Sequence, residues 1–259
     1  MISNKNTEID GISGSIGYIK MRHEGKLYIF FLDNHESTEY CKGSVVFVHE
    51  IFDQIFPNND YNLFVEEPME KDLSLQLLYK TQHIEKYLQY LEGKQNAHRF
   101  DLRFRLDKTN ITDTFHSVQK FLEKVKTGCK PLDNHKRMIM LFIYHSLKYY
   151  VKNKIPKKGH GALLLTRFPF IDGNTLVKLM SIDYVKEILL NSIMEFYLIV
   201  LLLASNKPNN IIYLGAAHGI VVTRLLESRY GFVIEKDVQM PIGEVFNLKN
   251  LDALKSCIN

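Results

Sequence analysis

The stretch that decides the fold is Asn210–Phe232, which reads NIIYLGAAHGIVVTRLLESRYGF. Ile211–Leu214 is a short apolar run with a preference for β-structure, typical of a strand buried on both faces. Gly215-Ala216-Ala217 then permits a tight turn and a close approach of the backbone to a ligand. Apolar side chains at helical spacing follow until Gly231 ends the helix, and another strand begins. This order places His218 at the carboxyl end of a strand, where open α/β sheets bind ligands.

Two other interpretations of this stretch remain open at this point. It could be an ordinary connection between a strand and a helix, with a histidine at the surface. Its small residues also resemble the nucleotide-binding turn of an AdoMet-dependent methyltransferase. That fold needs several further strand–helix units after the turn, and only 40 residues follow Gly219. A Rossmann dinucleotide site fails for the same reason, and the stretch lacks the G-x-G-x-x-G pattern.

Composition places the chain among ordinary globular proteins. Its 259 residues are 46% hydrophobic and 24% charged, which suits one large domain with its own core. The formal charge of +4 is mild and spread along the chain, so it does not argue for a specific nucleic-acid site. Three isolated cysteines without a C-x-x-C pair indicate a reducing compartment and exclude a cysteine-rich zinc module.

The amino-terminal segment and the most apolar run bear on location. Residues 1–15, MISNKNTEIDGISGS, are polar and carry acids, so we expect a flexible leader and not a signal peptide or mitochondrial presequence. The apolar run Phe196–Ala204 is too short to span a bilayer and fits a buried core helix. We therefore expect a soluble cytoplasmic protein without a transmembrane segment.

Apolar strands and amphipathic helices alternate along the chain. This order favours a sheet of mainly parallel strands flanked by helices. We predict a single α/β domain over residues 1–259, with a helical insertion or cap at about 111–205 before the carboxyl-terminal βαβ unit. Strands are predicted at 16–21, 26–32, 61–65, 100–104, 211–214 and 232–234, and helices at 45–55, 72–91, 112–126, 134–152, 176–205 and 220–229.

Several predicted strands end in ionisable side chains. The carboxyl ends of parallel strands meet at one edge of a sheet, so we expect these groups to converge there. Histidine nitrogens and carboxylate oxygens are suitable ligands for a divalent ion such as zinc or manganese, and a further carboxylate can take a proton from a bound water. Without a metal, a carboxylate–histidine pair can act as a general base. The side chains at these strand ends are Asp33, His35 and Glu36, then Glu66 and Glu67, then His218, with a weaker fourth group at His98, Asp101 and Arg103.

Roles can be assigned within this set. We predict His35, His218 and Glu66 as metal ligands or base, with Asp33 as an acidic partner and Gly215 providing close backbone approach to the bound group. Arg103 is assigned to an anionic substrate group or to the charge of a transition state. Glu36, Glu67 and Asp101 are second-rank candidates. Two simpler interpretations stay open, namely that Arg103 only pairs with Asp101 and that Glu67 is solvated.

These motifs resemble the superfamily that groups TraB/TIKI-type proteases with erythromycin-esterase-like and ChaN-like proteins. Gly215-Ala216-Ala217-His218 matches its carboxyl-terminal Gly-x-x-His motif, and Phe64–Pro68 is similar to its acidic strand end. The first histidine motif reads Leu32-Asp33-Asn34-His35, with an aspartate in place of glutamate and without the family's glycine.

The resemblance implies a hydrolase that cleaves a peptide or ester bond in a small-molecule or peptide substrate, with a divalent metal as its cofactor in the metal-dependent form. The missing glycine favours an alternative, in which a catalytically degraded member of the same fold serves as an interaction, regulatory or ligand-binding protein. The sequence does not indicate an oligomeric state.

Overall fold

The computed structural model describes residues 11–33, 45–56, 60–69, 82–152 and 182–239. These residues form the predicted α/β fold, with a mixed sheet of mostly parallel strands flanked by helices. The chain divides into two compact units, of which the first combines Met1–Arg99 with Ser205–Asn259. The second unit, Phe100–Ala204, overlaps the helical insertion predicted at about 111–205. Whether the chain behaves as a single folding domain stays a prediction.

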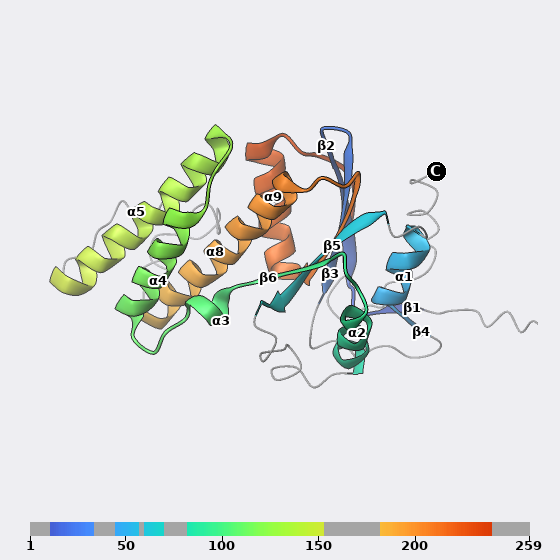
Figure 1. The fold of residues 1–259 in the computed structure, drawn as a ribbon, viewed down its shortest axis with the longest axis horizontal. Coiled ribbons are helices and arrows are strands. Elements are labelled where there is room, and N and C mark those ends of the chain that lie inside the picture. The colour runs from blue at the N-terminus through green and yellow to red at the C-terminus, as the bar shows by residue number, and fades with distance from the viewer. Residues whose placement is uncertain (1–10, 34–44, 57–59, 70–81, 153–181, 240–259) are drawn as a thin grey trace, which may run out of the picture. The chain divides into compact units, whose positions relative to one another are not determined.

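The described strands are β1 (Gly11–Ser13), β2 (Gly17–His23), β3 (Lys26–Asp33), β4 (Val45–Phe47), β5 (Tyr61–Pro68), β6 (Ala97–Asp101), β7 (Asn209–Gly215) and β8 (Val233–Gln239). The described helices are α1 (Val48–Ile55), α2 (Gln82–Glu92), α3 (Arg103–Leu106), α4 (Ile111–Lys124), α5 (Lys130–Lys152), α8 (Ile182–Ala204) and α9 (Ala216–Tyr230). Figure 1 shows these elements along the chain.

The main sheet has six strands in the order β6-β5-β7-β3-β2-β8. Strand β7 comes late in the sequence but lies between β5 and β3 and is parallel to both. Strand β2 is antiparallel to β3 and to β8, so β8 runs in the same direction as β3. This topology brings the carboxyl ends of β3, β5 and β7 together at one edge, as the apolar runs in the sequence predicted.

Helices cover both faces of the central strands (Figure 1). Helices α1 and α2 supply Ile51, Phe52 and Tyr87 to a core that also contains Phe31 of β3 and Tyr213 of β7. Helix α9 contacts β3 and β7 through the opposite face, since successive side chains of a strand point to alternate sides. The two faces of the sheet therefore carry separate sets of side chains.

Gly219 allows α9 to pack closely on the sheet. A Cβ atom at this position would lie 2.3 Å from Leu32 Cδ2 and 3.4 Å from Leu214 Cδ2. Both leucines are buried, so they have little room to move. We expect Gly219→Ala to lower the free energy of unfolding by about 1–3 kcal/mol, because overpacking outweighs the higher helix propensity of alanine.

Urea unfolding followed by circular dichroism measures this effect, and Gly93→Ala is the matched control. A Cβ atom at Gly93 would meet nothing within 4 Å. That variant should therefore retain or slightly exceed the stability of the parent protein. Equal stabilities for the two variants would mean that α9 can shift away from the sheet without cost.

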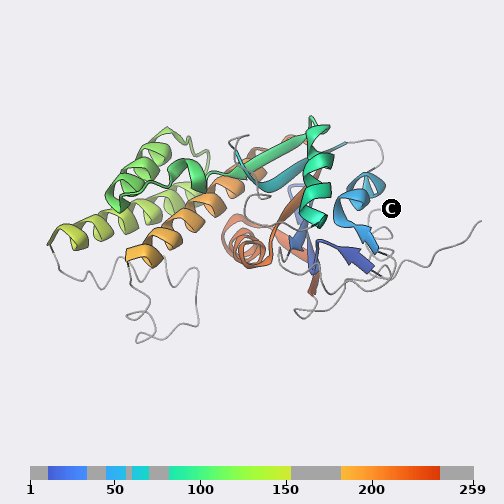
Figure 2. The same cartoon turned by 90° about the horizontal axis from the view of Figure 1, so that it is seen from below.

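The second unit is a helical assembly in which α3, α4 and α5 contact one another or α8. Figure 2 shows α4, α5 and α8 side by side. The core of this unit includes Phe115 and Leu122 of α4, Phe142 of α5 and Phe196 of α8.

Helix α8 is the one helix among the described residues that is long and apolar enough to cross a membrane, over Val185–Ala204. Of the most apolar 18 residues of this helix, 61% are buried inside the structure.

Several predicted boundaries differ from the structure. Residues Val45–Phe47, predicted to begin a helix, form β4 and pair in parallel with β1. The pairing is possible because Gly11–Ser13, assigned to the leader, is itself a strand. The strand predicted at 100–104 ends at Asp101, and Arg103 already belongs to α3. Local periodicity does not reveal which short segments find a strand partner elsewhere in the chain.

Candidate functional site

Glu66 and His218 meet at the carboxyl edge of the sheet. Glu66 follows the buried apolar part of β5, and His218 lies in the first turn of α9. His218 Nε2 is 3.7 Å from Glu66 Oε1, and only 12% and 4% of the respective side chains are exposed. The sequence-based expectation that these residues converge therefore agrees with the structure.

The backbone of Gly215 fixes the Glu66 carboxylate. Gly215 N–H donates a hydrogen bond of 2.7 Å to Glu66 Oε2, the oxygen that does not face the histidine. Gly215 is the last residue of β7 and the residue preceding α9, so the turn predicted from Gly-Ala-Ala sits against the acid of β5. Gly215 was predicted to bring the backbone close to a bound group, and the group it contacts here is this side chain.

Asp33 lies at the same edge of the sheet but on the α1–α2 face. Tyr213 Oη donates a 2.7 Å hydrogen bond to Asp33 Oδ2, and both side chains are buried. Tyr213 belongs to the core under α1 and α2, which places Asp33 on that side. Glu66, by contrast, makes its contacts with Gly215 and with His218 of α9. Asp33 and Glu66 therefore occupy opposite faces of one edge.

Glu67 and Tyr87 share the surroundings of Asp33. Glu67 is fully buried, which excludes the simple interpretation of a solvated carboxylate. Tyr87 packs against Tyr213 with ring centroids 4.6 Å apart. Burial, followed by the negative charges of Glu67 and Asp33, raises the pKa of Tyr87 well above its usual value. Burial and Asp33 have the same effect on the pKa of Tyr213. Both phenols are therefore neutral at physiological pH.

The two tyrosines differ in what their hydroxyl groups contact. The Tyr213 hydroxyl donates to Asp33, whereas the Tyr87 hydroxyl has no hydrogen-bond partner among the described residues. We expect Tyr213→Phe to destabilise the protein by about 1.5–3 kcal/mol, the usual contribution of a hydrogen bond to a charged group. Tyr87→Phe should leave the free energy of unfolding unchanged or raise it, because it removes a buried hydroxyl that has no partner among the described residues.

Chemical unfolding of both variants checks this prediction. The substitutions remove the same atom from neighbouring buried rings, so each variant serves as the control for the other. A loss in Tyr87→Phe as large as in Tyr213→Phe would show that the Tyr87 hydroxyl also holds the folded chain together.

Asp101 and Arg103 form an ion pair within the second unit, in which the Asp101 side chain is fully buried and a quarter of the Arg103 side chain is exposed. Arg103 Nε and Nη2 each donate a 2.9 Å hydrogen bond to Asp101, and the backbone N–H of Arg103 donates a third bond at 3.0 Å. Arg103 Nη1 donates to Asn191 Oδ1 of α8 at 3.0 Å. The guanidinium group thus joins α3 to α8 by contacts within the protein. The simpler interpretation left open by the sequence describes Arg103 better than a role in holding substrate.

His98 lies near the start of β5, and His35 and Glu36 lie outside the described residues. His98 Nε2 is 3.4 Å from Asn62 Oδ1, and its ring stacks on Phe64. Asn62 and Glu66 are four residues apart on β5, a separation of about 13 Å along a strand. Burial lowers the pKa of His98, which favours its neutral form. His98 therefore does not join the carboxyl edge.

Glu66 and His218 are a partial match to a metal site. Two ligands of a tetrahedral zinc ion stand about 3.3 Å apart if each bond is about 2.0–2.1 Å. The observed 3.7 Å between Glu66 Oε1 and His218 Nε2 is close to that separation. Within the described part of the chain, no cluster of three or more His, Cys, Asp or Glu side chains is arranged to hold a metal ion. The third predicted ligand, His35, is outside this part.

Sequence reasoning missed the tyrosines of this edge. Tyr213 sits in the middle of the apolar run of β7 and Tyr87 on the apolar stripe of α2, so both patterns indicated only core residues. The hydroxyl group of a tyrosine within an apolar run is the one feature of the sequence that could have identified them, because a buried tyrosine hydroxyl usually forms a hydrogen bond.

Comparisons of the chain with protein-family models, with curated proteins and with solved structures find no match. The resemblance to the TraB/TIKI and erythromycin-esterase-like superfamily accordingly stays a prediction from short motifs.

Proposed function

We propose that this chain is a hydrolase that cleaves a peptide or ester bond, with Glu66 and His218 at its centre. The observation that carries the proposal is the contact of a buried carboxylate with a histidine at the carboxyl edge of a parallel sheet. We further propose the TraB/TIKI, erythromycin-esterase-like and ChaN-like superfamily as its relatives, a small-molecule or peptide substrate, and a cytoplasmic location.

The proposed chemistry needs a general base and a carboxylate held in one orientation beside it. Glu66 is oriented by the Gly215 N–H, so one of its oxygens is held in place while the other faces His218. The gap of 3.7 Å exceeds a hydrogen bond, but catalytic contacts in an unliganded site often tighten only when substrate binds. In this arrangement His218 takes the proton of the attacking water and Glu66 stabilises the resulting imidazolium.

A metal-dependent form of the same proposal assigns Glu66, His218 and His35 as ligands of zinc or manganese. Such an ion, when bound, lowers the pKa of its water to about 7 and so supplies hydroxide at neutral pH. Asp33 lies two residues before His35 and is anchored by Tyr213, which fixes the end of β3 from which His35 follows. Asp33 is accordingly a positioning residue in this form.

Metal analysis and hydrolysis assays of the purified protein test the proposal. The expected result is hydrolysis of a p-nitrophenyl ester or a fluorogenic peptide, lost in His218→Ala without a comparable loss of stability. The metal-dependent form also predicts one equivalent of a divalent ion, absent from His35→Ala and His218→Ala. A metal-free protein whose melting temperature does not change when Zn²⁺ or Mn²⁺ is added would contradict only the metal-dependent form. Absence of hydrolysis across both substrate classes, with or without metal, would leave the interaction or ligand-binding alternative.

A further inference from the structure

A hollow of about 770 Å³ lies on the second unit beside the first half of α4. Asp113, His116, Ser117 and Lys120 line it from positions i, i+3, i+4 and i+7 of the helix, which share one helical face. The segment Lys108–Asn110, which leads into α4, lines it as well. Its volume is in the range of about 300–1,000 Å³ that is usual for small-molecule sites.

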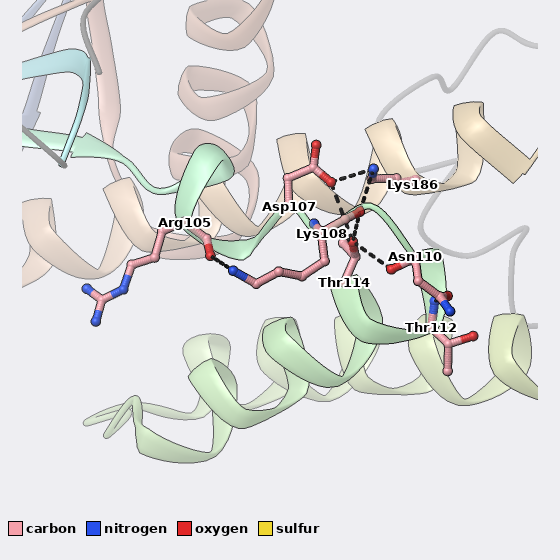
Figure 3. Close-up of polar contacts among 7 residues, drawn as sticks. All are labelled: Arg105, Asp107, Lys108, Asn110, Thr112, Thr114 and Lys186. Atoms are coloured by element: carbon pink, nitrogen blue, oxygen red, sulfur yellow. Dashed lines mark hydrogen bonds and ion pairs between the residues drawn. The ribbon is translucent and has the colours of Figure 1, made fainter. Parts of the chain in front are cut away.

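The segment Lys108–Asn110 is held in place by polar contacts, which Figure 3 shows. Lys108 N–H donates a 2.9 Å hydrogen bond to Thr114 Oγ1, and Lys186 Nζ of α8 donates to Lys108 O at 3.0 Å. Asn110 accepts a 2.8 Å bond from Thr112 N–H, and Lys186 pairs with Asp107. The backbone of Lys108 and the side chain of Asn110 are therefore held in place before any ligand binds.

The lining is rich in groups that donate hydrogen bonds to anions. Lys108 and Lys120 supply two ammonium groups, and Thr109, Asn110 and Ser117 add hydroxyl and amide donors. The Lys108 ammonium uses one donor on Arg105 O at 3.0 Å, and an ammonium group has three. Asp113 is the one carboxylate that lines the hollow among the described residues.

The second unit as a whole is basic. It contains 17 of the chain's 33 Lys and Arg but only 9 of its 29 Asp and Glu, so its formal charge is +8. The first unit is left with −4, and the positive charge is therefore not spread along the chain as composition suggested. A positive field over the second unit raises the local concentration of anionic ligands.

We propose that this hollow binds a phosphorylated small molecule, with Lys108 and Lys120 contacting its phosphate groups. Lysine is a common phosphate ligand that acts as a point charge, and two lysines on different segments suit a multiply charged anion. The neighbouring hydroxyl and amide groups bind further oxygens of the ligand. The site belongs to the second unit and does not depend on the proposed hydrolase.

Calorimetric titration of the full chain tests this site with inorganic phosphate, pyrophosphate and ATP, each at constant ionic strength. Pyrophosphate or ATP should bind in preference to phosphate. Lys120→Gln and Lys108→Gln should each weaken that binding about tenfold or more, since each removes a charge-assisted hydrogen bond. Asp113→Asn should strengthen it by roughly threefold, because it removes the one opposing charge.

Lys124→Gln is the matched control for Lys120→Gln. Lys124 lies one turn further along α4, is exposed and does not line the hollow, so the two variants change net charge equally. We expect Lys124→Gln to change affinity by less than about twofold. Equal losses in the two lysine variants would overturn the site in favour of general electrostatic attraction. Absence of binding by all three probes would also overturn it. Tighter binding of a single-stranded RNA oligonucleotide than of ATP, unaffected by Lys120→Gln, would overturn it in favour of an extended basic face.

Discussion

Glu66→Gln should reduce the rate of hydrolysis by about 10²-fold or more while leaving the fold intact. The glutamine carbonyl can still accept the hydrogen bond from Gly215 N–H, so the junction of β7 and α9 keeps its geometry. The negative charge that stabilises His218 as an imidazolium is lost. A positioned acid–base pair contributes about 10²–10⁴-fold to a rate, which sets the size of the expected effect. Initial rates on the best p-nitrophenyl ester measure it.

Two further variants decide whether the effect belongs to Glu66. Glu227→Gln removes an exposed carboxylate from α9 and should leave the rate unchanged. Glu67→Gln makes the same change to the buried neighbour, whose charge acts on Tyr87. A larger loss of activity in Glu67→Gln than in Glu66→Gln would indicate that the catalytic carboxylate is Glu67, on the α1–α2 face. The assigned pair with His218 would then be wrong.

Arg103→Ala should lower the free energy of unfolding by about 3 kcal/mol. The substitution removes the three guanidinium nitrogens of Arg103, two of which contact Asp101 and one Asn191. The fully buried Asp101 carboxylate is then left without its ion-pair partner. Loss of one partner of a buried ion pair typically costs about 3–5 kcal/mol, and Arg103 is at the lower end because a quarter of its side chain is exposed. Urea unfolding monitored by the helical circular dichroism signal measures the change.

A double-mutant cycle separates the ion pair from other effects of the substitution. The double variant Asp101→Ala/Arg103→Ala should be more stable than the sum of the single losses predicts, with a coupling of about 2 kcal/mol. Arg105→Ala, which removes an exposed arginine of the same short helix, is the control for loss of positive charge. Unchanged stability in Arg103→Ala combined with loss of hydrolysis would restore Arg103 as a substrate-binding residue.

Much of the fold was predictable because it depends on local patterns. The continuously apolar runs of β3, β5 and β7 indicated central parallel strands, and these strands lie side by side in the sheet. Gly231 was expected to end the helix after His218, and it does so with a left-handed backbone at φ 74°. Both predictions concern neighbours in sequence, where hydrophobic period and glycine conformation are sufficient evidence.

The site was only partly predictable because it depends on which side of a strand each residue faces. The sequence indicated that Asp33, Glu66 and His218 share one edge, and the described residues agree. It did not indicate that Asp33 turns toward Tyr213 and α1–α2 while Glu66 turns toward α9. It ranked Glu66 above the adjacent Glu67 but did not indicate that the pleat of β5 directs the two acids to opposite faces.

The sequence alone thus determined the α/β class, the parallel central strands and the edge at which the ionisable groups gather, because apolar period and strand-end position are written locally along the chain. The tertiary structure decided the pairing of Glu66 with His218, the ion pair of Arg103 with Asp101, and the hollow beside α4. The first depends on segments far apart in sequence, the second on the direction of one side chain, and the third on how the segment before α4 lies against that helix. Such long-range placement results from packing of the whole fold, which no local pattern records.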